Sequence, residues 1–293
     1  MPTPAESQWH IGVICGSGLA AGLALDAAQV IEVASPFGLP SAAVSTGTLA
    51  GVRVTVLARH GEGHTIPPSQ INYRANIDVL KRCGVTDLIA LSAIGSLNAA
   101  MAPGEFVAID QFIDRTAGRA NSFFGPGLAA HVNLADPVCP RLRARLVAAA
   151  QAEEAVVHDG GCYVAIEGPQ FSTRAESRLY QSWGGDVIGM TGMPEARLAR
   201  EAELPYAMLG MVTDYDSWRE NDAGVEAGEV VALMQRSAEL AQHLVERMVA
   251  ALPTSRSPSP IDTALDAAIM TPPAARDPAL VARLSAVAGR VLE

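Results

Sequence analysis

The chain has 293 residues, of which 49% are hydrophobic and only 5% aromatic, and its formal net charge at pH 7 is −10. This apolar fraction excludes a generally disordered chain, and the negative charge provides no basic stripe for a nucleic-acid backbone. One small anion can still be bound, because a local pocket of hydrogen-bond donors is sufficient for that.

The cysteines and the hydropathy pattern indicate the cellular compartment in which the protein is expected. None of the four cysteines forms a C-x-x-C pair, and no apolar stretch approaches the ~18 residues needed to cross a bilayer. The first residues lack a charged start followed by an apolar run, so we expect no secretory signal. We therefore expect a cytoplasmic protein with free thiols and no membrane contact.

The first half of the chain alternates between apolar runs and amphipathic segments. Residues 11–15 (IGVIC) form a short apolar run that predicts a buried strand, and residues 70–83 carry apolar side chains at helical spacing. Residues 114–137 are rich in Gly, Pro, Asn and Ser, which is typical of a long functional loop. Further strands are expected at residues 52–58, 87–92 and 105–109.

The second half continues this alternation. We expect helices at residues 141–152, 173–183, 195–202 and 227–251, and strands at residues 156–166, 187–189 and 206–212. The repeated alternation predicts an α/β fold, a single domain over residues 1–252 with a twisted, mixed and largely parallel sheet flanked by helices.

Residues 253–293 are expected to form a linker and a helical C-terminal extension. The segment 253–260 (PTSRSPSP) has a linker composition, and Asp277 with Pro278 suits the start of a helix. The apolar side chains of Leu280, Leu284 and Val287 share one face of that helix. This face needs a partner, either the body of the protein or a neighbouring subunit.

Polar side chains follow several of the predicted strands. In open α/β sheets, ligands bind beyond the carboxyl ends of the strands, so we expect these residues to converge. A guanidinium fork, hydroxyls and backbone N–H groups together suit a phosphate. Residues 16–18 and Ser92 also fit an ordinary strand-to-helix turn and a strand-end cap. The polar residues in question are Ser17, Arg59, His60, Ser92 and Thr191.

Asp214 and Asp216 follow the strand at residues 206–212. Alternation along an extended chain puts both carboxylates on the same side. One of them, with a raised pKa, can donate a proton to a leaving group. A solvated Asx turn is the alternative interpretation of the pair.

Two other motifs carry less weight. His60 and His64 invite a metal site, but a third ligand is lacking and the glycines between them do not suit a helix. Residues 16–21 match G-x-G-x-x-A, but the acidic residue that a dinucleotide fold needs is not at the required distance. We therefore expect no metal and no cofactor.

Together these clusters resemble the 5'-methylthioadenosine phosphorylase branch of the trimeric purine nucleoside phosphorylase family. The resemblance covers about residues 10–252 in the correct order. The matching stretches are residues 11–19 (IGVICGSGL), 35–38 (SPFG), 58–64 (ARHGEGH), 72–76 (NYRAN), 104–116 (GEFVAIDQFIDRT), 166–177 (IEGPQFSTRAES), 189–196 (GMTGMPEA) and 213–218 (TDYDSW).

The resemblance implies a role for each matching residue. The phosphate site would comprise Ser17, Arg59, His60, Ser92, Ala93 and Thr191. The substrate contacts would be Phe171 on the purine, Ser172 and Asp216 on the base, Asp214 facing purine N7 as the acid, Met190 on the ribose, Val230 near the 5'-substituent, and His131 reaching the active site of a neighbour. The resemblance also implies a homotrimer that works in purine and methionine salvage.

The implied reaction is phosphate-dependent cleavage of 5'-methylthioadenosine, with phosphate as co-substrate. A carboxylate at Asp214, where enzymes for 6-oxopurines have an amide, and an apolar Val230, where they have a histidine, favour this branch. Ala227 in place of a larger residue suggests that 5'-deoxyadenosine is also a substrate. The alternatives are a phosphorylase for 6-oxopurine nucleosides or methylthioinosine, a non-catalytic nucleoside-binding protein, and a nicotinamide-dependent oxidoreductase.

Overall fold

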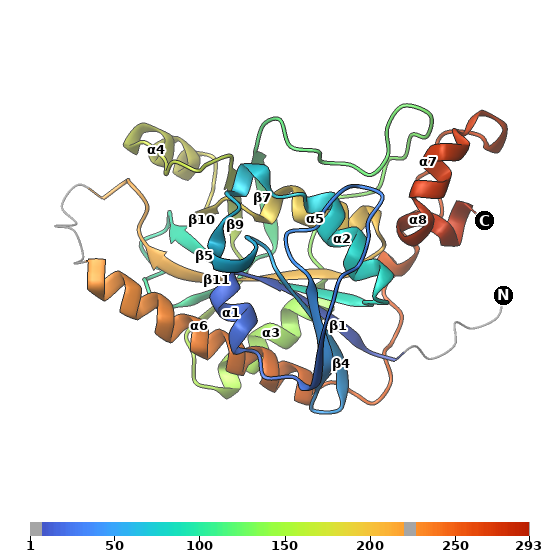
Figure 1. Cartoon of the computed structure of the whole chain (residues 1–293). Coiled ribbons are helices and arrows are strands. Elements are labelled where there is room, and N and C mark those ends of the chain that lie inside the picture. The colour runs from blue at the N-terminus through green and yellow to red at the C-terminus, as the bar shows by residue number, and fades with distance from the viewer. Residues whose placement is uncertain (1–7, 220–226, 293) are drawn as a thin grey trace.

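The computed structural model describes residues 8–219 and 227–292, apart from the side chains of Ser17, Met234 and residues 227–232. Within this part of the chain, 11 strands form one mixed sheet in the order β2-β3-β4-β1-β5-β10-β9-β7, with β11, β6 and β8 attached through β5 (Figure 1). The strands are β1 (His10–Cys15), β2 (Asp26–Ile31), β3 (Val44–Leu49), β4 (Val52–Ala58), β5 (Asp87–Ser96), β6 (Phe106–Ala108), β7 (Gln111–Arg115), β8 (Val157–Asp159), β9 (Cys162–Ile166), β10 (Val187–Gly189) and β11 (Tyr206–Asp214).

The long strand β5 is the centre of this sheet. Its first residues pair in parallel with β1, and its last two, Gly95 and Ser96, pair antiparallel with β10. Along its other edge β5 pairs in parallel with β11. Because β1, β4, β5 and β11 run in the same direction, their carboxyl ends meet at one edge of the sheet.

Helices cover both faces of the sheet, as Figure 1 shows. The side chains of α1, α3 and α6 belong to one apolar core, and those of α2, α5, α7 and α8 belong to another. This arrangement confirms the predicted α/β architecture with helices on both faces. The helices are α1 (Ser17–Gly22), α2 (Tyr73–Arg82), α3 (Pro140–Ala152), α4 (Arg174–Ser182), α5 (Gly192–Glu201), α6 (Ala227–Ala250), α7 (Pro278–Arg283) and α8 (Ser285–Leu292).

Two element predictions need correction. The expected strand at residues 156–166 is two strands, because Gly160, with a φ of +117°, turns the chain between them. β8 then pairs with β6, and β9 pairs with β7 and β10. The expected helix at residues 70–83 begins only at Tyr73, because the Asn72 side chain caps it by accepting a hydrogen bond from Ala75 N.

The C-terminal extension packs on the body of the protein. Leu280, Leu284 and Val287 are buried in the same core as α2, which confirms that their apolar face finds a partner. The expected linker is also anchored, since the buried Arg256 forms ion pairs with Asp87 at the start of β5 and with Asp262.

The four cysteines are free thiols. Among the described residues, no helix combines the length and the apolar character that crossing a membrane requires.

Candidate active site

A pocket of about 540 Å³ opens at the carboxyl ends of β1, β4, β5, β10 and β11. The structure brings most of the predicted site residues together there, although they come from segments far apart in the sequence. Those that line the pocket are Arg59, His60, Ser92, Ala93, Phe171, Met190, Thr191, Asp214 and Asp216.

Four predicted residues are not described at the pocket, and one of them, Ser172, is buried but does not line it. Ser17 is the first residue of α1, and its side chain lies outside the described residues. Val230 belongs to α6, and its side chain also lies outside them. His131 is exposed and does not line the pocket of its own chain; its backbone N–H donates to the Ala268 carbonyl in the C-terminal extension.

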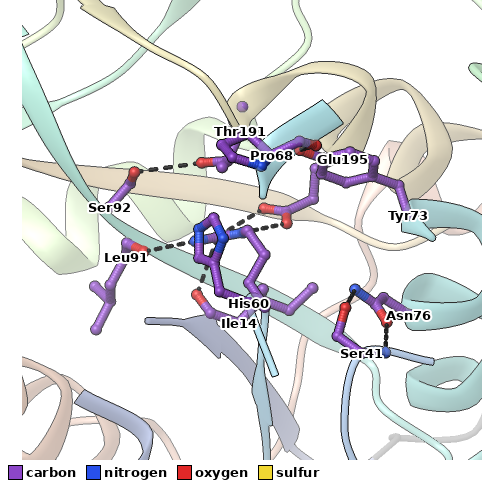
Figure 2. A network of polar contacts seen from close by, with 12 residues as sticks. Ile14, Ser41, His60, Pro68, Tyr73, Asn76, Leu91, Ser92, Thr191 and Glu195 are labelled. Atoms are coloured by element: carbon purple, nitrogen blue, oxygen red, sulfur yellow. Dashed lines mark hydrogen bonds and ion pairs between the residues drawn. The ribbon is translucent and has the colours of Figure 1, made fainter. Parts of the chain in front are cut away.

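Arg59 follows β4 and has a side chain that is only 1% exposed. Its Nε and Nη2 donate to the two carboxylate oxygens of Glu195, at 2.8 and 3.1 Å. Glu195 therefore occupies the Nε and Nη2 edge of this fork, and the contact between Arg59 and a phosphate stays a prediction. Nη1 also donates to the Leu91 carbonyl and Nη2 to the Ile14 carbonyl, and Figure 2 shows these two residues together with Glu195.

The charge of Arg59 is stabilised by Glu195. Burial alone lowers the pKa of this guanidinium, but the Glu195 carboxylate outweighs it, so the pKa lies above its usual value. The Tyr206 hydroxyl donates to Glu195 at 3.0 Å and holds that carboxylate in place. Arg59 still lines the pocket, so it contributes a fixed positive charge there, already balanced by Glu195.

His60 presents a neutral ring to the pocket. Burial lowers its pKa to about 4, with a further contribution from Arg59, although the hydrogen bond to Ile66 opposes the shift. Its Nδ1 must carry the hydrogen, because the Ile66 carbonyl at 2.9 Å can only accept. Nε2 is therefore a hydrogen-bond acceptor. The ring stacks on His64, with centroids 4.1 Å apart.

Hydroxyl groups from β5 and from the start of α5 line the same pocket as Arg59 and His60. Ser92 Oγ and Thr191 Oγ1 are 3.3 Å apart, although residues 92 and 191 belong to different elements. Figure 2 shows the two side chains pointing toward each other. This pair joins two of the segments predicted to contact phosphate. Within the described part of the chain, no three His, Cys, Asp or Glu side chains gather in a metal-binding arrangement.

Two carboxylates occupy the other end of the pocket. Asp214 ends β11, and its oxygens accept from Asp216 N at 2.8 Å and from the Thr213 hydroxyl at 2.7 Å. Asp216 has a φ of +49°, and its carboxylate accepts from the Ser177 hydroxyl. Burial raises the pKa of Asp216; the hydrogen bond from Ser177 opposes this shift, and Asp214 adds to it.

The strand β5 makes room for this pair. A Cβ atom at Gly95 would lie 3.0 Å from Asp214 Oδ1, so any other residue there would displace the carboxylate. Nearby, the Phe171 ring is 79% exposed and free to stack on a planar ligand. Ser172 Oγ is buried without a hydrogen-bond partner among the described residues, next in the chain to the pocket residue Phe171.

The phosphorylase superfamily model matches residues 10–250. The chain belongs to the phosphorylase superfamily. It is 52% identical to the S-methyl-5'-thioadenosine phosphorylase of Bradyrhizobium diazoefficiens, over 98% of this chain and 99% of that one.

Solved structures agree with this match. The chain is similar to a methylthioadenosine phosphorylase from an Antarctic soil metagenomic library, with a TM-score of 0.89, 41% identity, and coverage of 96% of this chain and 99% of the other. It is also similar to a mutant adenosine/methylthioadenosine phosphorylase from Schistosoma mansoni in complex with methylthioadenosine. There the TM-score is 0.77 at 36% identity, with coverage of 83% and 91%.

Sequence reasoning missed two polar residues of this phosphorylase. Glu195 is 1% exposed, and it lies on α5 among the buried Ala196, Leu198 and Ala199. A charged residue on an apolar helix face signals a buried ion pair, and that signal was available in the sequence. Ser177, fully buried on α4, is the residue that holds Asp216, and an isolated serine gives no comparable signal.

Proposed function

We infer that this chain catalyses the phosphate-dependent cleavage of the N-glycosidic bond of methylthioadenosine. The products are adenine and 5-methylthioribose 1-phosphate. One observation carries this conclusion: near-full-length similarity to methylthioadenosine phosphorylases coincides with a single pocket that has a cation and hydroxyl groups at one end and a carboxylate pair at the other.

Phosphate occupies the end formed by Arg59, His60, Ser92, Ala93 and Thr191. Phosphate near neutral pH carries at least one O–H group, and the free Nε2 of neutral His60 can accept it. Arg59 supplies a positive charge that Glu195 keeps in position, while the hydroxyls bind the remaining oxygens. The role of this end is to orient the nucleophile beneath the anomeric carbon.

The sugar develops positive charge as the glycosidic bond breaks, because the transition state of glycosyl transfer resembles an oxocarbenium ion. The phosphate anion stabilises this charge from one side. Met190 contacts the ribose. The family resemblance assigns Val230 to the 5'-substituent, where an apolar residue would leave a 5'-hydroxyl without a partner.

The adenine leaves toward Asp214 and Asp216. Asp214 faces purine N7, Asp216 and Ser172 bind the base, and Phe171 packs on the ring. Burial raises the pKa of Asp216, which favours a protonated carboxyl at this end of the pocket. That proton is delivered to the departing base as general acid catalysis requires.

We also propose that the active enzyme is a homotrimer in which His131 completes the site of a neighbour. His131 is exposed, it is absent from the pocket of its own chain, and it lies against the C-terminal extension. The extension, residues 253–293, then acts together with the catalytic body of residues 1–252.

A substrate panel tests the activity. Release of free base is measured from methylthioadenosine, 5'-deoxyadenosine, inosine and methylthioinosine, each with and without phosphate. We expect release to require phosphate and to be much faster for the adenine nucleosides. Equal or faster cleavage of inosine would establish the alternative of a phosphorylase for 6-oxopurine nucleosides. If no substrate is cleaved, the alternative of a non-catalytic nucleoside-binding protein would be supported instead.

A further inference from the structure

Arg119 lies in the loop that follows β7, and its side chain is only 2% exposed. Its guanidinium donates to six acceptors, which engages all five of its N–H groups. Nε donates to the Glu167 carboxylate at 2.9 Å, Nη1 to the Tyr73 hydroxyl at 3.0 Å, the Met190 carbonyl at 2.7 Å and the Met193 carbonyl at 2.9 Å, and Nη2 to the Ile166 carbonyl at 3.3 Å and the Glu167 carbonyl at 2.7 Å.

One of these contacts holds the peptide between Met190 and Thr191. Arg119 bonds the carbonyl of that peptide, and the N–H of the same peptide donates to the Tyr163 hydroxyl at 3.2 Å. The peptide plane is therefore held from both sides. Met190 and Thr191 both line the pocket, one assigned to the ribose and the other to the phosphate.

A second set of contacts holds the segment that carries the base contacts. Ile166 and Glu167 begin the stretch that continues to Phe171 and Ser172. This stretch passes close to Met190, since a Cβ atom at Gly168 would lie 2.4 Å from the Met190 sulfur. Arg119 therefore ties the start of the base segment to the ribose segment.

The third contact reaches the wall of the pocket near His60. The Tyr73 hydroxyl accepts from Arg119 and donates to the Pro68 carbonyl at 3.0 Å. Pro68 lines the pocket, and it lies two residues beyond Ile66, the partner of His60. One guanidinium thus reaches three separate walls of the same pocket.

We propose that Arg119 is a positioning residue that sets the base, ribose and phosphate segments relative to one another. The proposal rests on the function inferred above. Each segment keeps its own ligand contacts without Arg119, but their mutual alignment is lost. A misplacement of about 1 Å between reacting groups can lower a rate by about 100-fold.

Arg119→Lys tests this directly, because lysine keeps the charge but has only three donors on a single atom. We expect kcat to fall by about 100-fold, while the KM for methylthioadenosine and the KM for phosphate change much less. Arg119→Ala should behave likewise, and guanidinium ion, added far below denaturing concentrations, should restore part of its kcat.

Arg256→Lys is the matched control. Arg256 is also nearly buried, at 5% exposed, and it is paired with Asp87 and Asp262, but it lies at the opposite end of β5 from the pocket. Its replacement should lower the melting temperature and leave kcat and both KM values unchanged. If kcat falls in both Arg119→Lys and Arg256→Lys, and falls only as much as the fraction of folded protein falls, then Arg119 only stabilises the fold.

Two other results would overturn the proposal. One is a folded Arg119→Lys enzyme with the wild-type kcat and KM values, and the other is an Arg119→Ala enzyme that guanidinium does not restore. If both variants fail to fold, Tyr73→Phe removes one of the six acceptors, and an unchanged kcat there would refute the proposal. A wild-type enzyme without phosphate-dependent cleavage would instead refute the proposed function, so the two failures are distinguishable.

Discussion

Arg59 and Glu195 form a buried, two-pronged ion pair at the wall of the pocket. The nitrogen–oxygen distances are 2.8 and 3.1 Å, and both side chains are 1% exposed. A cation held this way cannot turn toward a ligand, so it acts as a fixed charge. Preorganised charge of this kind needs no rearrangement when a substrate binds.

Glu195→Gln leaves the charge of Arg59 buried without a counter-charge. We expect the free energy of unfolding to fall by about 3 kcal/mol. The KM for phosphate should rise more than the KM for the nucleoside, because Arg59 lies at the proposed phosphate end. Chemical denaturation and steady-state kinetics measure both. Glu153→Gln, which breaks the exposed pair with Arg247, should cost less than about 1 kcal/mol, and equal losses in the two variants would contradict the argument.

Asp214→Asn replaces the proposed acid with an amide. We expect cleavage of methylthioadenosine to fall by about 100-fold or more, because proton transfer to the leaving base is lost. Cleavage of methylthioinosine should rise relative to it. The ratio of kcat/KM values for the two nucleosides is the measurement. Asp266→Asn, at a side chain that is 56% exposed, should leave that ratio unaltered, and an adenine preference that survives in Asp214→Asn would refute the assignment.

Ser177→Ala removes the hydroxyl that holds Asp216. This hydrogen bond lowers the pKa of Asp216, so its loss should raise that pKa further. We expect the limb of the kcat/KM profile governed by this carboxyl to move to higher pH. Ser182→Ala is the control, because Ser182 lies on the same helix but is exposed and donates to the Leu179 carbonyl of its own helix. An unshifted profile in Ser177→Ala would remove Asp216 from the proton-transfer scheme.

His10 and His60 both contribute to the pH dependence of the free energy of unfolding. The pKa of each ring is lowered, first by burial, from 6.5 to about 4. As the pH falls from 6.5 toward 4, the unfolded chain binds protons that the native rings do not, so the contribution of these two rings to stability should decrease in this window. Glu201, whose pKa burial raises to about 7, contributes in the opposite direction. The difference between the free energies of unfolding at pH 7 and at pH 5 should be smaller in His10→Gln than in the wild type. His243→Gln changes an exposed ring and should preserve the difference; the same result from His10→Gln would be evidence against this origin.

Leu284→Ala tests how firmly the C-terminal extension is attached. Leu284 is fully buried in the core that includes α2, so its truncation should cost about 3 kcal/mol, through lost burial and the cavity left behind. Thermal unfolding measures this cost. Val156→Ala, at a side chain that is 57% exposed, should change little. A cost no greater than that of Val156→Ala would mean that the extension is not held through this side chain.

The parallel centre of the fold could be predicted because its strands are mostly buried and consist largely of apolar residues. β1 and β4 were placed within one residue of their observed bounds for this reason. β2 could not be found this way, since its side chains are exposed and carry no buried period. β7 was not predicted, and its last two residues were assigned to the loop expected at residues 114–137. The reason is that the residues of β7 are half-buried or exposed.

The site could be predicted in its composition but not in its pairings. Arg59, Ser92 and Thr191 lie at or just beyond the ends of the strands predicted from the sequence, and the rule for open α/β sheets was enough to expect them in one place. Which partner an arginine takes depends on residues 136 positions away, as with Glu195. Arg119 shows the same limit, because its acceptors are mostly backbone carbonyls, which carry no sequence signal.

The position of β5 in the sheet limits how the substrate range of this protein can evolve. Ser92 and Gly95 lie on one continuous strand, three residues apart, which spans about 10 Å at the rise of an extended chain. The strand therefore fixes the distance between the anion end and the base end of the pocket. Since one inserted or deleted residue would turn every later side chain to the opposite face, new substrates have to be gained through the surrounding loops while this spacing is conserved.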